Sequence, residues 1–172
     1  MKTGSQGLAL IKKKEKFKPR AYLCPARKWT IGYGHVILAS EQHLRTAVLT
    51  EPQASELLAC DVVGFEKAVL RTIHVPLSQA QFDACMSLCY NIGPGSEREG
   101  TGFAGSSVAR AINARTSEAT IRLNWYKFNK ADGTHDGKDN DGDGQVDEAG
   151  EKRVLPGLVV RRQKEADLYF SK

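Results

Sequence analysis

Residues 9–36 read ALIKKKEKFKPRAYLCPARKWTIGYGHV, and their pattern changes once, at Pro19. Before this proline, apolar residues recur near helical spacing among lysines, which predicts a short helix over residues 6–17 with Glu15 near its end. Proline interrupts a helix, so we expect the helix to stop there. The aromatic, glycine-punctuated residues 20–35 then indicate a small antiparallel hairpin or a three-stranded sheet.

Further along the chain, two capping boxes predict where two helices begin. In a capping box, a Ser or Thr at the N-cap and a Gln three residues later satisfy each other's backbone N–H groups. Thr50 begins a helix long enough to span between two lobes, and Ser78 begins a buried central helix that ends at the turn of residues 91–95. We expect shorter helices at residues 108–113, 117–128 and 159–170.

These elements predict an α+β fold that is mainly helical, with a small antiparallel sheet near the N-terminus. We expect one domain over residues 1–172. Its first lobe covers about residues 12–60, and a long helix joins it to a helical second lobe of about residues 61–172 plus the N-terminal helix. The chain has 172 residues and is 41% hydrophobic, which is enough for a core of this size.

The four cysteines are too few and too widely spaced for the disulfide framework of a small secreted scaffold. Cys85 and Cys89 lie one helical turn apart beside apolar residues, so we interpret them as core contacts, and we expect most of the four to be buried thiols. The sequence has no CxxC motif and no Cys/His cluster that would indicate zinc.

The net charge of +5 is unevenly spread, because residues 132–148 contain seven acids against Lys138. The rest of the chain is therefore strongly basic and attracts a polyanion such as nucleic acid, anionic lipid or bacterial wall polymer. The basic residues are scattered, and helix-turn-helix, zinc-finger and RRM patterns are missing, so we expect no nucleic-acid partner. No apolar run reaches the ~18 residues of a membrane span, so we expect no stable membrane insertion.

Glu15, Cys24 and Thr30 follow one another along the chain, and Thr30 directly precedes the sequence IGYGH at residues 31–35. Taken alone, Glu15 would be a solvated partner of a lysine, and Thr30 would be an ordinary strand residue. Their occurrence together at this spacing is what gives the chain its resemblance to a known family.

The run at residues 9–36 resembles the catalytic segment of the phage-type lysozymes, glycoside hydrolase family 24, in which a glutamate, an aspartate or cysteine, and a threonine have this spacing. The resemblance continues in VPLSQAQFDACMSLCYNIGPG (residues 75–95) and VLPGLVVRRQKEADLYF (residues 154–170), and omits only about residues 132–152. It implies a muramidase that hydrolyses the β-1,4 bond between N-acetylmuramic acid and N-acetylglucosamine in peptidoglycan, for lysis of a bacterial host.

Cleavage of a glycosidic bond requires an acid that protonates the leaving oxygen and a base or nucleophile across the sugar ring. Glu15 can be the acid if partial burial keeps it protonated near neutral pH. Cys24 stands where many relatives carry Asp, and a thiol has an ordinary pKa of about 8.5 against about 3.9 for Asp. Cys24 could polarise the attacking water, act as a nucleophile, or hold water beside Thr30. The resemblance favours the first role, with inversion of configuration.

Gly34, His35 and Asn91 are candidates for substrate binding. Gly32 and Gly34 can permit a close approach of the sugar to the backbone. We expect His35 to satisfy a hydrogen bond or ion pair near Glu15 in preference to acting as an acid or base. The resemblance implies that Asn91 hydrogen-bonds the glycan, and its position also suits a helix C-cap, which is compatible with that role.

An acidic insert at residues 132–151 contains DNDGDGQVDE at residues 139–148, which matches an EF-hand calcium loop. Carboxylates at alternate positions of such a loop converge on one cation, and the alternative is a disordered acidic loop. The loop's twelfth position is Gly150 instead of Glu, so Glu148, Glu151 or water must complete the coordination sphere. We predict a structural Ca²⁺ site with the ligands Asp139, Asp141, Asp143, Gln145, Asp147 and Glu148.

Two other classes of function stay open. A lytic transglycosylase would use Glu15 alone, with a hydroxyl group of the sugar as the attacking group. A non-catalytic, calcium-dependent wall-binding protein would keep only the fold.

The N-terminus has no long apolar run and no small-residue cleavage site. We therefore expect the protein to accumulate in the host cytoplasm and to reach the periplasm and cell wall through membrane holes. We also expect a monomer whose partner is peptidoglycan.

Overall fold

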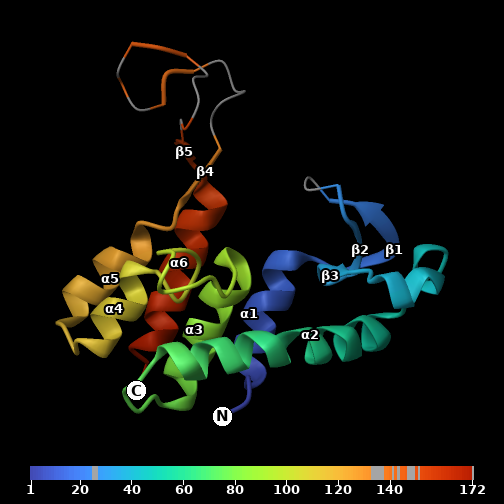
Figure 1. The fold of residues 1–172 in the computed structure, drawn as a ribbon, viewed down its shortest axis with the longest axis horizontal. Coiled ribbons are helices and arrows are strands. Elements are labelled where there is room, and N and C mark those ends of the chain that lie inside the picture. Colours follow the sequence, from blue (N-terminus) through green and yellow to red (C-terminus); the bar gives the residue numbers. More distant parts are fainter. Residues whose placement is uncertain are drawn as a thin grey trace.

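Two lobes are joined by one long helix (Figure 1). The structure is a computed structural model that describes residues 1–24, 27–132, 138–140, 142, 144–146, 150 and 152–171. In chain order the elements are α1 (Ser5–Glu15), β1 (Lys18–Leu23), β2 (Trp29–Gly32), β3 (His35–Val36), the 3-10 helix η1 (Ala39–Arg45), α2 (Glu51–Thr72), α3 (Gln79–Ile92), α4 (Ser107–Asn113), α5 (Glu118–Tyr126), β4 (Lys130–Asp132), β5 (Lys152–Val154) and α6 (Pro156–Tyr169).

The first lobe is built on the antiparallel sheet β1-β2-β3. The helix before it ends earlier than the sequence predicts, at Glu15, because Lys16 leaves helical geometry with a φ of 54°. Phe17 consequently lies outside the helix and packs against Tyr33 with ring centroids 5.8 Å apart. Pro19 does not end the helix but lies in β1, where its carbonyl accepts a hydrogen bond from the backbone N–H of Leu49 at 2.8 Å. An edge strand tolerates a proline because no ladder hydrogen bond is lost there.

Helix α2 runs along one side of the molecule and connects the lobes (Figure 1). The predicted capping box is confirmed, since the Thr50 hydroxyl and the Gln53 side chain bond each other's backbone N–H groups. Its buried face includes Leu58, Val62 and Val69. The helical spacing of these residues explains why a single helix can pack against both lobes.

Helix α3 forms the centre of the second lobe and packs against α1, α2 and α6. Every residue of the run 82–89 is buried. The capping box at Ser78 is confirmed, and the helix ends at Ile92 with Gly93 in a left-handed conformation at φ 81°. The C-cap role considered for Asn91 is therefore wrong, because Asn91 still lies inside the helix. Among the described residues, no helix is long and apolar enough to span a membrane.

The other helices agree with the sequence apart from their ends. Helix α6 begins at Pro156, three residues before the predicted start, because proline suits the first turn of a helix, where no N–H partner is lost. Cys85 and Cys89 are buried as expected, and burial raises the pKa of the Cys89 thiol to about 12. Cys60, however, is exposed on α2.

Candidate active site

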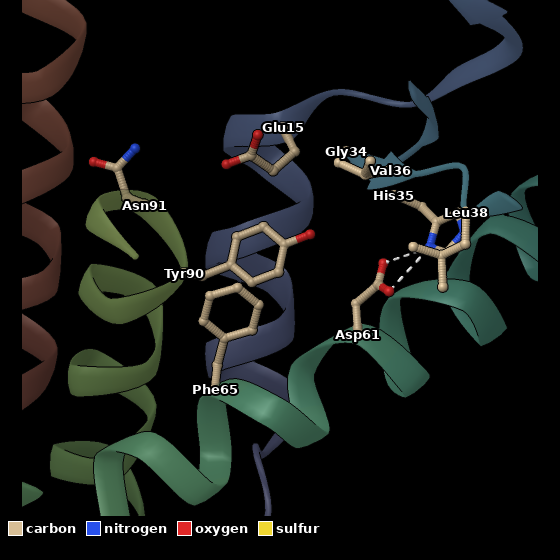
Figure 2. Close-up of a pocket in the computed structure, with 9 residues that line it drawn as sticks. All are labelled: Glu15, Gly34, His35, Val36, Leu38, Asp61, Phe65, Tyr90 and Asn91. Atoms are coloured by element: carbon tan, nitrogen blue, oxygen red, sulfur yellow. Dashed lines mark hydrogen bonds and ion pairs between the residues drawn. The ribbon is translucent and has the colours of Figure 1, made fainter. Parts of the chain in front are cut away.

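A cleft of about 440 Å³ lies between the lobes. Figure 2 shows Glu15 at the end of α1, the rings of Tyr90 and Phe65 beneath it, and His35 with Asp61 on the side of the first lobe. The Tyr90 and Phe65 rings are 4.9 Å apart and supply an apolar floor. The described residues that line the cleft are Glu15, Gly34, His35, Val36, Leu38, Asp61, Phe65, Tyr90 and Asn91.

The helix that carries Glu15 is anchored at its start by a carboxylate from another helix. Helix α1 has no side-chain cap of its own. Instead, the buried side chain of Asp83 on α3 accepts hydrogen bonds from the backbone N–H groups of Gly4 at 2.8 Å and Gly7 at 3.0 Å. These N–H groups would otherwise lack partners, and a negative charge at a helix N-terminus is favourable. Asp83 thereby fixes the position of α1 and of the carboxylate at its other end.

Glu15 lies half-buried in the cleft wall, with 27% of its side chain exposed. Its Oε1 atom accepts a hydrogen bond from Nη1 of Arg161 on α6 at 3.3 Å. Arg161 also donates from Nη2 to the Ser87 carbonyl at 3.0 Å, so the guanidinium is held from two sides. The Arg161 guanidinium therefore holds the Glu15 carboxylate in a defined position at the wall of the cleft.

Behind Arg161 lies a glutamate that no solvent reaches. Glu165 is fully buried. Its Oε1 accepts hydrogen bonds from Ser87 Oγ at 2.6 Å and Arg161 Nε at 3.0 Å. Its Oε2 accepts from Trp125 Nε1 at 2.9 Å and lies 3.2 Å from Arg162 Nε. The roles of Arg161, Arg162 and Glu165 were not predicted from the sequence, although two arginines followed by a glutamate one helical turn later are a detectable signal.

Asn91 lies where the sequence predicts a glycan contact, at the second-lobe edge of the cleft. Its Oδ1 accepts a hydrogen bond from Arg162 Nη2 at 2.7 Å. Arg162 is fully buried, and burial lowers its pKa to about 10. It therefore stays charged at neutral pH. Its Nε and Nη1 atoms make no hydrogen bond with the part of the chain that the structure describes.

His35 makes hydrogen bonds and ion pairs, as the sequence predicts. Its partners are the carboxylates of Asp61 and Glu41. Its Nδ1 lies 2.9 Å from an oxygen of Asp61 on α2, and its Nε2 lies 3.0 Å from Glu41 in η1. Burial lowers the pKa of His35, but the hydrogen bonds and charges of Asp61 and Glu41 outweigh this effect and raise it. Both ring nitrogens are engaged, so His35 ties β3 to α2 at the edge of the cleft.

We expect the His35 interactions to stabilise the fold most below neutral pH. Because the pKa of His35 is raised in the folded state, this stabilisation is complete below the unfolded value of about 6.5 and is lost as the pH rises through the folded value. A charge-assisted pair contributes about 1.5 kcal/mol or more. Melting temperatures of the wild type and His35→Gln should therefore differ more at pH 6 than at pH 9. The control His74→Gln changes an exposed histidine, and a pH-independent His35→Gln difference would contradict the prediction.

The two glycines have different surroundings. Gly34 has a φ of 92°, and a Cβ there would lie 3.7 Å from both Glu15 Oε2 and the Tyr90 hydroxyl, so its lack of a side chain keeps the space beside Glu15 open. A Cβ on Gly32 would instead approach Ala54 Cβ on α2 at 3.2 Å. The close approach at Gly32 is therefore to a helix, Gly32 is not among the described residues that line the cleft, and a sugar contact there stays a prediction.

Cys24 and Thr30 lie on the hairpin, and of the described residues neither belongs to the set that lines the cleft around Glu15. Cys24 is half-buried, and its backbone N–H donates to the Lys28 carbonyl at 3.0 Å. Thr30 is buried opposite Tyr22, and its hydroxyl donates to the same carbonyl at 3.1 Å. Burial raises the pKa of Tyr22, and the charges of Glu15 and Cys24 raise it further, so Tyr22 lies within electrostatic reach of both.

Only part of the predicted calcium loop belongs to the described residues. Among all the described residues of the chain, no group of three or more His, Cys, Asp or Glu side chains could hold a metal ion. Asp139 and Gln145 are exposed. The carboxylate of Asp139 accepts hydrogen bonds from the backbone N–H groups of Gly142 at 2.6 Å and Gly144 at 3.0 Å. The other predicted ligands, Asp141, Asp143, Asp147 and Glu148, lie outside the described residues.

The chain is similar in sequence and in fold to known lysozymes and endolysins. The model of a protein family described as phage lysozyme matches residues 12–165. The endolysin of Acyrthosiphon pisum secondary endosymbiont phage 1 is 33% identical over 99% of both chains. The muramidase domain of SpmX from Asticaccaulis excentricus is 31% identical with a TM-score of 0.77 over 99% of both chains. A P22 lysozyme mutant is 28% identical with a TM-score of 0.74, again over 99% of both chains.

Proposed function

The chain belongs to the phage lysozyme family, and we propose that Glu15 is the acid with which it cleaves peptidoglycan. It is a lysozyme, a glycoside hydrolase that degrades peptidoglycan at the bond between N-acetylmuramic acid and N-acetylglucosamine. The assignment to Glu15 is carried by one observation. Its carboxylate reaches the cleft between the lobes, half-buried, beside an open space that Gly34 preserves.

In the proposed reaction, a water molecule attacks the anomeric carbon while the bond from that carbon to the bridging oxygen breaks. The proton of Glu15 passes to the leaving oxygen. The thiolate of Cys24, assisted by the Thr30 hydroxyl, accepts a proton from the attacking water. An inverting enzyme needs room for a water molecule between its two groups, and this division of roles places that water between Glu15 and Cys24.

The stereochemistry of the first product tests this assignment of roles. Direct attack by water inverts the anomeric centre, whereas a covalent intermediate on Cys24 would lead to retention. Proton NMR of a soluble oligosaccharide substrate, recorded before the anomers equilibrate, should show the α-anomer first. Initial appearance of the β-anomer would exclude water activation by Cys24 in favour of a nucleophilic thiol.

We further propose that the insert at residues 132–151 binds a structural Ca²⁺ ion through Asp139, Asp141, Asp143, Gln145, Asp147 and Glu148. The alternating carboxylates of the sequence support this proposal. The two hydrogen bonds that Asp139 accepts from the backbone N–H groups of Gly142 and Gly144 also support it, because they curl the chain around the Asp139 carboxylate. The ion would order the loop and take no part in the chemistry. EF-hand-type loops of extracellular modules bind at about 10⁻⁴ to 10⁻³ M, so the site would fill after release from the cytosol.

Calcium should therefore raise the melting temperature of the protein. A ligand present at 100 times its Kd stabilises the folded state by about 2.7 kcal/mol, which corresponds to a shift of roughly 5–10 °C for a chain of this size. The measurement is differential scanning calorimetry in CaCl₂ at about 100 times the Kd, which is about 10 to 100 mM for a site of this class, and in EDTA, with MgCl₂ at the same concentration as the ionic control. Asp139→Asn should abolish the shift, and equal melting temperatures of the wild type in calcium and EDTA would contradict the site.

The biological setting follows the family. We assign the chain to glycoside hydrolase family 24 and propose that it acts as a monomer. We also propose that it accumulates in the cytoplasm of a bacterial host and reaches the cell wall at lysis. Its basic net charge of +5 suits the anionic wall.

A further inference from the structure

Helix α6 places three charged residues in the interior, where apolar residues would carry no comparable desolvation penalty. Arg161, Arg162 and Glu165 have at most 4% of their surface exposed. Burying charges carries a desolvation penalty, and replacing such a cluster with apolar side chains often leaves a protein as stable as before or more stable. Stability alone therefore does not explain why this charged cluster lies against the residues of the cleft.

One carboxylate oxygen of Glu165 leads to the acid. Oε1 accepts from Ser87 Oγ at 2.6 Å and from Arg161 Nε at 3.0 Å. The same guanidinium then donates from Nη1 to Glu15 at 3.3 Å. We call this series of contacts, from Ser87 through Glu165 Oε1 and Arg161 to Glu15, the acid branch.

The other oxygen leads to the proposed glycan contact. Oε2 accepts from Trp125 Nε1 at 2.9 Å and lies 3.2 Å from Arg162 Nε. Arg162 then donates from Nη2 to Asn91 at 2.7 Å. This is the one hydrogen bond that the Arg162 side chain makes to the described chain, although a fully buried guanidinium has five N–H groups whose desolvation is unfavourable. We call the series from Trp125 through Glu165 Oε2 and Arg162 to Asn91 the glycan branch.

We propose that Glu165 is a positioning residue of the lysozyme reaction, whose two oxygens separately set the acid Glu15 and the glycan-side amide of Asn91. The proposal rests on the proposed function of those two residues. Because both branches meet at one buried carboxylate, the acid and the amide keep a fixed relation to each other on the second-lobe side of the cleft. Misplacement of a catalytic group by about 1 Å can reduce the rate by about 10²-fold.

Two mild substitutions separate the branches. Ser87→Ala removes a donor to Oε1, and Trp125→Phe removes a donor to Oε2, while both keep the buried charges. Loss of one hydrogen bond that steadies a catalytic group should change a kinetic constant by roughly fivefold. Ser87→Ala should lower kcat roughly fivefold and leave KM unchanged, and Trp125→Phe should raise KM by a similar factor with kcat unchanged.

The pH profile provides a readout that a purely structural role would not move. In Ser87→Ala the less firmly held guanidinium stabilises the Glu15 carboxylate less, so the alkaline limb of the kcat profile should move to higher pH. In Trp125→Phe this limb should stay in place. Glu165→Gln should alter both constants, and the two milder variants decide the matter if Glu165→Gln does not fold.

The matched control is Ser106→Ala, which removes a buried hydroxyl that caps α4 in the second lobe. It should lower the melting temperature without changing kcat, KM or the alkaline limb. The proposal is overturned if Ser87→Ala and Trp125→Phe behave like this control, or if both variants change kcat and KM together. Failure of the wild type to cleave peptidoglycan would instead refute the function of Glu15, so the two failures are distinguishable.

Discussion

Replacing Glu15 with Gln will lower kcat for peptidoglycan hydrolysis by about 10²- to 10⁴-fold. The amide has the shape of the acid but cannot give a proton to the leaving oxygen. Its carbonyl can still accept the hydrogen bond that Arg161 Nη1 makes to Glu15 at 3.3 Å, so the fold should tolerate the change. The measurement is the rate of reducing-end release from purified peptidoglycan, together with the melting temperature of the variant.

A surface glutamate supplies the control. Glu56→Gln makes the same chemical change on the exposed face of α2 and should keep wild-type kcat. If Glu15→Gln retained more than a tenth of wild-type kcat while folded, Glu15 would not be the acid.

The Cys24 series should show the second largest effect on activity. Cys24→Ala removes the proposed proton acceptor and should lower kcat about 10²-fold. Cys24→Asp restores a base that is fully ionised at neutral pH and should recover most of the rate. Cys24→Ser keeps the size of the side chain but has no readily ionised group, so its kcat should remain close to that of Cys24→Ala. The same reducing-end assay measures all three.

Cys60→Ala is the matched control, because Cys60 is exposed on α2, and it should not change kcat. Wild-type kcat in Cys24→Ala would show that the thiol has no part in activating water. The attacking group would then have to be the sugar's own hydroxyl, as in a lytic transglycosylase, or a water activated elsewhere.

Local patterns in the sequence predict the architecture well because their physical causes are local. The capping boxes at Thr50 and Ser78 each depend on a residue three positions away, and both helices begin where predicted. The hairpin follows from aromatic and glycine residues close together in the chain. The end of the first helix was misplaced because Lys16 leaves helical geometry before the proline is reached.

The surroundings of Glu15 could not be predicted in the same way. Arg161 is far from Glu15 in the sequence, and only the packing of α1, α3 and α6 brings them together. The partners of His35 likewise come from α2 and η1, so the sequence predicts an ion pair but not with which residues. The sequence predicts which residues take part in the chemistry, and the three-dimensional packing determines which side chains hold them in place.

The most direct test of a muramidase that uses water is the mass of its products. Purified peptidoglycan digested with the wild-type protein should yield muropeptides that end in a hydrolysed N-acetylmuramic acid, with one water added for each bond cleaved. Mass spectrometry of the digest distinguishes these from anhydro products, which lack that water. Muropeptides with hydrolysed ends, absent from a Glu15→Gln digest, are the predicted result. Anhydro products, or hydrolysed ends at N-acetylglucosamine, would contradict it.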